Sequence, residues 1–137
     1  MKHLFLLFLT LMPTLIYSQK DILKNTKDSC SCDYSNNVFS ITEEPAEFVS
    51  GHASMIKFLQ DNIHRTEETE IMGIVVVQFI IDTHGYLCKS KILKGIRGCT
   101  SCSKEALRVV SLMPKWIPGK MNGRAVNCEY NLPVQFK

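Results

Sequence analysis

The chain has 137 residues, of which 45% are apolar and 21% are charged, and its formal net charge at pH 7 is +3. Its sixteen Lys and Arg residues are interspersed with thirteen Asp and Glu residues. Proteins that bind nucleic acid usually concentrate basic residues on one face, so this balance argues against nucleic acid as a partner.

The first 18 residues have the pattern of a secretory signal peptide. A charged head at Lys2 and His3 precedes an apolar run from Leu4 to Ile16, and the segment ends at Ser18. The run is shorter than the roughly 20 apolar residues that a membrane span requires. We therefore predict cleavage and export to the periplasm or the exterior; an uncleaved anchor is the alternative and would be the one reason to expect membrane attachment.

Six cysteines follow this segment, at positions 30, 32, 88, 99, 102 and 128. An even number of cysteines in a short exported chain favours disulfides, and the sequence leaves the pairing open. Cys99 and Cys102 form a Cys-x-x-Cys pair, for which a structural disulfide is the simplest interpretation. Two close cysteine pairs without histidines at ligand spacing are a weak zinc motif, so we predict no metal and no other cofactor.

Residues 19–42 are polar and lack a sustained apolar period, which predicts a tail or linker. Residues 43–50 are expected to be extended and to lead to the first helix. We expect the domain to occupy 43–137. Apolar residues at helical spacing then predict a first helix over 53–63, with Ser54 as one candidate start.

The sequence GIVVVQFIID at 73–82 predicts the central strand, because seven of these ten residues are Ile, Val or Phe. Both of its faces are apolar apart from Gln78, so both need cover. Asp82 and Gly85 provide turn chemistry, and residues 86–93 then return as an antiparallel strand.

A second helix is predicted from Ser103, a good N-cap, to the residue before Pro114. Residues 114–125 indicate an ordered loop in which Trp116 packs on the core. The final strand begins at Val126, and Pro133 places it at a sheet edge or ends its pairing.

These elements predict an α+β fold with a three-stranded antiparallel sheet in the order 2-1-3 and two helices on one face. The other face then needs the N-terminal segment, a second copy of the chain or a ligand as cover. Cys88 and Cys128 fall on the two outer strands, roughly two strand spacings of about 4.8 Å apart. This separation predicts that they do not pair with each other.

Several separated blocks, in the right order, resemble the C-terminal domain of TonB-type energy transducers. They are EEPAEF at 43–48, SMIKFLQDNI at 54–63, VVVQFIID at 75–82, KEALRVVSLMPKWIPGK at 104–120 and the terminal YNLPVQF. The resemblance covers 43–137. Family transducers have a long proline-rich spacer, whereas residues 19–42 contain no proline, so we expect a free-standing, signal-peptide-bearing relative.

The resemblance implies a periplasmic, non-enzymatic binding module linked to energy-dependent transmembrane transport. In the family, the domain grips a short extended peptide, the TonB box, of an outer-membrane transporter; another envelope protein is the alternative partner. Such a grip is β-augmentation, in which a peptide satisfies the unpaired backbone groups of an edge strand. The edge carried over to this chain consists of Val126, Asn127, Cys128, Glu129, Tyr130, Asn131 and Leu132.

Two other functions remain open from the sequence. The first is a thiol-disulfide oxidoreductase with Cys99 as the nucleophile and Cys102 as the resolving thiol, because a helix N-terminus lowers a thiol pKa. The second is a disulfide-stapled module that forms a homodimer through its open sheet face. His52, His64 and His84 are scattered and read as solvated residues, and no catalytic arrangement emerges. The lysines at 89, 91 and 94 predict a charged strand edge that resists aggregation.

Overall fold

The computed structural model describes residues 37–64 and 71–137. In chain order its elements are β1 (Val38–Phe39), α1 (His52–Asn62), β2 (Gly73–Ile81), β3 (Leu87–Lys94), α2 (Thr100–Ser111), β4 (Lys120–Met121), β5 (Arg124–Ala125) and β6 (Asn127–Phe136). Within these two ranges, no helix is long and apolar enough to cross a membrane. The expected signal peptide at 1–18 and most of the expected linker at 19–42 lie outside the described residues.

The main sheet has four strands in the order β1-β6-β2-β3. β2 pairs antiparallel with both β3 and β6, which confirms the predicted central strand and the order of the three predicted strands. The predicted three-stranded antiparallel sheet is nevertheless wrong, because β1 adds a parallel fourth strand to β6 and makes the sheet mixed. β1 consists only of Val38 and Phe39 and is too short to show the alternation of a strand in the sequence. Their extended conformation depends on pairing with the edge of β6.

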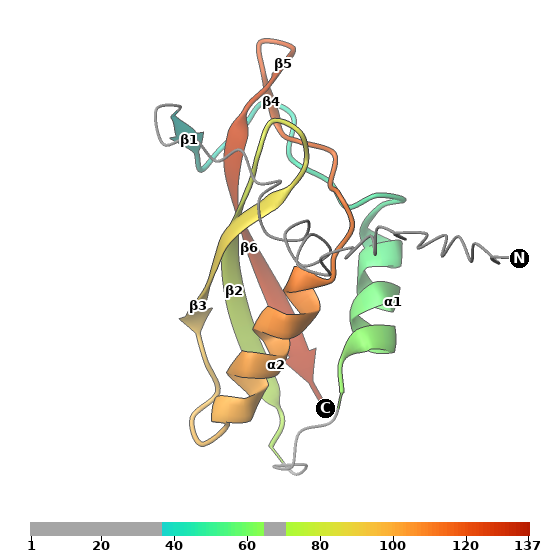
Figure 1. Ribbon diagram of the computed structural model, residues 1–137, viewed down its shortest axis with the longest axis vertical. Helices are drawn as coiled ribbons and strands as arrows, with labels where there is room; N and C mark the ends of the chain where they lie inside the picture. Colours follow the sequence, from blue (N-terminus) through green and yellow to red (C-terminus); the bar gives the residue numbers. More distant parts are fainter. Residues whose placement is uncertain (1–36, 65–70) are drawn as a thin grey trace, which may run out of the picture.

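Both helices lie on one side of the sheet, with α1 toward β6, as Figure 1 shows. The face of β2 beneath them is fully buried, and its side chains are Val75, Val77, Phe79 and Ile81. On the opposite face Ile74 is 49% exposed. The described elements thus form a two-layer fold in which the helices cover one face of the sheet.

The hairpin predicted at Asp82–Gly85 is confirmed. The buried Asp82 Oδ1 accepts hydrogen bonds from the backbone N–H of His84 and of Tyr86, at 2.8 and 2.9 Å. Gly85 has φ +88°, and a Cβ at this position would lie 2.0 Å from the carbonyl oxygen of Trp116. The backbone N–H of Trp116 also donates to the Gly85 carbonyl at 2.8 Å. The turn therefore requires glycine both for its backbone conformation and for the close approach of the 114–119 segment.

Both predicted helices occur, but each begins elsewhere than expected. The Cys99 Sγ accepts a hydrogen bond from the Cys102 N–H at 3.2 Å, which makes Cys99 the N-cap of α2 and places Ser103 inside the helix. Gly51 is the N-cap of α1 with φ +88°, and Ser54 instead donates from its Oγ to the Ser50 carbonyl at 3.0 Å. In neither helix is the N-cap one of the residues that cap best through a side-chain oxygen, namely Ser, Thr, Asp or Asn.

The predicted loop at 114–125 is ordered, and it contains a hairpin of its own. β4 and β5 pair through Asn122 and Gly123, whose φ values of +50° and +72° suit a tight two-residue turn. Trp116 is 3% exposed and confirms its predicted packing role. Its ring lies 5.6 Å from Phe48, 5.5 Å from Phe79 and 4.7 Å from Tyr130, measured between ring centroids.

Candidate functional site

The outer edge of β6 is the candidate binding site. β6 pairs with β2 in an unbroken register from Cys128 opposite Ile81 to Phe136 opposite Gly73. On the other side, β1 covers only the start of the strand, with Val38 opposite Asn127 and Phe39 opposite Cys128. Within 37–64 and 71–137 no strand pairs with the outer side of residues 129–136. This leaves an eight-residue stretch of regular strand edge.

Pro133 indicates which backbone groups face this edge. It lies opposite Val76, and the pairing with β2 continues on both sides of it. Because proline has no N–H, it is tolerated in a paired strand where that group would point away from the neighbour. Backbone groups alternate in direction along a strand, so the N–H and C=O groups of Asn131 and Gln135 share the outward direction of Pro133.

Side chains of β6 alternate between the two faces of the sheet. Leu132, Val134 and Phe136 are buried under the helices, and Tyr130 is half-buried beside them. Asn131 faces the other way, where its Oδ1 accepts from Gln78 Nε2 at 3.0 Å. Leu132 thus anchors the strand, while Asn131 presents a polar side chain on the open face.

The first three residues of the predicted site have structural roles. Val126 precedes β6, and its N–H donates to the Gly119 carbonyl at 2.9 Å. Asn127 is buried, and its Oδ1 accepts from the Thr83 N–H at 3.1 Å. Cys128 is a buried free thiol whose pKa is raised by that burial. Val126 thus lies before β6, and Asn127 and Cys128 are the two residues of β6 that β1 covers.

The other four predicted residues lie on the uncovered part of the edge. Glu129 follows directly after the β1 pairing, and its Oε2 accepts from Ser40 Oγ at 3.2 Å. Tyr130, Asn131 and Leu132 come next along the strand. Burial raises the pKa of the Tyr130 hydroxyl, which therefore stays protonated at neutral pH.

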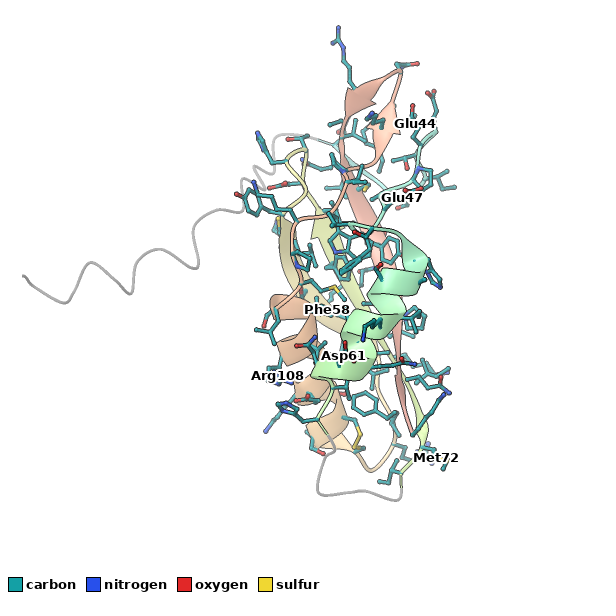
Figure 2. All side chains as sticks on the ribbon, turned by 90° about the vertical axis from the view of Figure 1, so that its right-hand side faces the viewer. Glu44, Glu47, Phe58, Asp61, Met72 and Arg108 are labelled. Carbon is teal, nitrogen blue, oxygen red and sulfur yellow. A yellow bond between two sulfur atoms is a disulfide. The ribbon has the colours of Figure 1, made fainter. Side chains whose placement is uncertain are left out.

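A pocket of about 240 Å³ lies next to this edge. It is lined by residues of the 46–51 approach, the first turn of α1 and β6, namely Ala46, Glu47, Phe48, Gly51, His52, Met55 and Tyr130. Figure 2 shows Glu47 beyond the N-terminal end of α1. Sequence reasoning found only Tyr130 of this set, because the other residues come together through the packing of α1 and follow no local pattern.

An ion pair within α2 also connects this helix to the C-terminal end of α1. Arg108 on α2 donates from Nη2 to the Asn62 carbonyl at 2.7 Å, and it pairs with Glu105 at 2.6 Å. Glu105 also accepts from the His64 N–H at 2.7 Å. The hydrogen bonds from Arg108 hold the pKa of the Glu105 carboxyl below its usual value. Figure 2 shows Arg108 beside the C-terminal half of α1.

The Cys99–Cys102 disulfide predicted from the sequence is confirmed, with a Cα–Cα distance of 5.3 Å. The two residues are only 1% and 0% exposed. Exchange between thiols and disulfides requires that the attacked sulfur be accessible, so this burial disfavours the oxidoreductase alternative. The bond instead closes the first turn of α2.

The remaining cysteine prediction concerns Cys88 and Cys128 on the two strands that flank β2. Cys88 is disulfide-bonded, whereas Cys128 is a free thiol, so the two do not pair with each other, as predicted. Among the described residues, no group of three or more His, Cys, Asp or Glu side chains could hold a metal ion.

Comparison with protein families gives a match over the C-terminal part of the chain. A family model described as Gram-negative bacterial TonB protein C-terminal matches residues 64–137, which is more than half of the chain. The match spans β2, β3, α2 and all of β6. Searches of the curated proteins and of the solved structures found no match.

Proposed function

Because the chain belongs to the family of Gram-negative bacterial TonB protein C-terminal domains, a family of protein-interaction modules, we propose that it captures an extended peptide on the outer edge of β6. The peptide is the TonB box of an outer-membrane transporter, the kind of partner with which domains of this family interact. Capture links the domain to energy-dependent transport across the outer membrane.

The uncovered edge at 129–136 is the observation that carries this proposal. Its register with β2 is unbroken, so its backbone is straight enough to pair with a second strand. Outward N–H and C=O groups at Asn131 and Gln135 give a peptide the main-chain hydrogen bonds of β-augmentation. Relative to the sequence prediction of 126–132, the proposed contact moves toward the C-terminus, because β1 pairs with Asn127 and Cys128.

The proposed compartment is the periplasm, where the family resides in Gram-negative bacteria. This location requires export, which we attribute to residues 1–18 acting as a cleaved signal peptide. The intact mass of the protein recovered from the periplasmic fraction tests this, because cleavage after Ser18 gives a chain that begins at Gln19. Recovery of the full-length mass from the membrane fraction would contradict it.

Calorimetric titration of the full chain with TonB-box peptides from transporters of the same cell tests the peptide grip. A strand that pairs on one side uses the N–H groups of alternate residues. We therefore expect N-methylation of every second peptide residue to abolish binding, while methylation of the intervening residues leaves the affinity within about threefold. Equal loss from both methylation patterns would contradict strand pairing, and so would equal tolerance of both.

A further inference from the structure

The pocket beside Tyr130 lies where a peptide strand on β6 would first find an uncovered edge. β1 ends its pairing at Cys128, and Tyr130 is the next residue of β6 whose side chain faces the helices. The pocket extends from Tyr130 to His52 and Met55 on the first turn of α1. It therefore sits directly at the junction between the covered and the uncovered part of the edge.

The geometry of sheets determines what an added strand would place there. Directly opposite residues on neighbouring strands point to the same face, with Cβ atoms about 4.5–5.5 Å apart. The peptide residue opposite Tyr130 thus points to the helix side, beside the pocket. The residues before and after it point to the open face, where Glu129 and Asn131 present polar groups.

The apolar part of the pocket lining, which lies beside the polar residues Glu47 and His52, suits a large apolar side chain. Phe48 and Met55 in its wall are 7% and 3% exposed. Behind Phe48 and Tyr130 lies Trp116, at ring distances of 5.6 and 4.7 Å. A cavity of about 150 Å³ with apolar walls is known to take up benzene, so a volume of about 240 Å³ can hold an aromatic ring. Ring edges and faces in this wall offer the contacts that aromatic pairs prefer.

We propose that this pocket is a specificity site that takes one aromatic or large aliphatic side chain of the bound peptide, at the position opposite Tyr130. The inference rests on the proposed function, because the peptide strand on β6 delivers the side chain. It adds a selection rule, since a peptide with a large apolar residue flanked by polar residues is preferred. Glu47 and His52 are exposed and form part of the lining, so they leave the pocket open to the peptide.

Two designed peptides test this inference on the full chain. The first has the sequence Lys-Thr-Val-Thr-Phe-Thr-Val-Thr, and the second has Ala in place of Phe; both have blocked ends. Because burial of a Phe side chain removes a large apolar surface from water, we expect the Phe peptide to bind at least tenfold more tightly. Affinities come from calorimetry, and amide shifts at Tyr130 and Met55 report the location.

A protein variant and a matched control test whether the pocket causes the tighter binding of the Phe peptide. His52→Trp places a large side chain at an exposed pocket position, and we expect it to reduce the ratio of the Phe-peptide affinity to the Ala-peptide affinity to less than about threefold. Gln60→Trp puts the same side chain at an exposed α1 position outside the lining and should change neither affinity. Circular dichroism confirms that both variants fold.

The outcomes separate this inference from the proposed function. If both peptides bind with equal affinity and shift amides of β6, the pocket does not select and this inference alone is overturned. A Phe preference that survives His52→Trp overturns it as well, because the side chain then binds elsewhere. If neither peptide binds at millimolar concentration while natural TonB-box peptides do, the selection rule is wrong and the edge remains the site. If no peptide binds at all, the proposed function is overturned together with the inference.

Discussion

β3 and β6 flank the same central strand, but their outer edges are built differently. The pairing of β3 with β2 is interrupted twice, between Val76 and Val77 and between Gln78 and Ile80. Lys89 of β3 has φ +52°, an unusual conformation for a residue with a side chain. Such bulges and exposed lysines are devices by which proteins keep strand edges from pairing with other chains.

The edge of β6 has neither a bulge nor a lysine over residues 129–136, although it contains Pro133. Its register runs without a shift, and it contains no lysine before the C-terminal Lys137. β1 pairs with the first two residues of β6. The pocket lies between α1, the segment before it and Tyr130 of β6. This difference between the two edges supports the proposal that a peptide strand adds to β6 rather than to β3.

The largest expected effect is on stability, because β6 and β3 differ in how deeply their leucine side chains are buried. Leu132 on β6 is 1% exposed, whereas Leu93 on β3 is 53% exposed. Leu132→Ala should lower the free energy of unfolding by about 2–5 kcal/mol, because it leaves a cavity under the helices. Leu93→Ala should change it by less than about 0.5 kcal/mol. Urea denaturation measures both, and similar losses would show that β6 is not the better anchored strand.

The second effect concerns the backbone of the β6 edge. Asn131→Pro removes an outward N–H without removing a ladder bond to β2, and we expect it to weaken binding of TonB-box peptides by roughly 3- to 10-fold. Asn131→Thr is the matched control, since it also loses the contact with Gln78 but keeps the N–H. An Asn131→Pro variant that is folded and binds as tightly as Asn131→Thr would contradict the proposed direction of the backbone groups.

A change remote from both edges should alter stability and leave binding intact. The pKa of Glu105 is lower in the folded protein, mainly through its hydrogen bonds with Arg108. This group therefore stabilises the fold above its unfolded pKa, and the contribution is lost as the pH falls through the folded pKa. We expect Glu105→Gln to cost about 1 kcal/mol at pH 7, and this cost to shrink towards zero as the pH falls through the folded pKa of Glu105.

Denaturation series at several pH values measure this difference. The exposed pair of Lys57 and Asp61 provides a control, in which Asp61→Asn should have little effect at any pH. A cost of Glu105→Gln that does not depend on pH would exclude the ion pair as its origin.

The smallest expected effect is on the β3 edge itself. Lys91→Ser removes an exposed charge from a strand that we expect to make no contact with the peptide. Stability should change by less than about 0.5 kcal/mol, and peptide affinity should stay within about twofold. Titration of the variant at low salt provides the measurement, and a large loss of affinity would move the binding site toward β3.

The sequence predicted the parts of the fold that follow local chemistry. The apolar run at 73–82, the Asp82–Gly85 turn and the helical spacing before Pro114 all led to elements that the structure contains. It could not predict β1, because Val38 and Phe39 become a strand only through the edge of β6. The β4–β5 hairpin was missed although Asn122-Gly123 is a strong turn signal, since its strands have only two residues each.

For the candidate site, the predicted stretch overlaps only in part with the edge that the structure leaves uncovered. The family resemblance indicated 126–132, whereas β1 covers Asn127 and Cys128. The pocket could not be predicted from the sequence, because Gly51 and Met55 meet Tyr130 only after α1 has packed on the sheet. Sites formed between distant segments leave no spacing in the sequence by which they could be found.

Hydrogen exchange measured by NMR, with and without a TonB-box peptide, tests the central claim most directly. If the peptide pairs with β6, the amides of Asn131 and Gln135 will gain protection of at least tenfold, while exchange in β3 stays unchanged. Protection that appears on β3, or on neither edge while the peptide is bound, would contradict strand addition at β6.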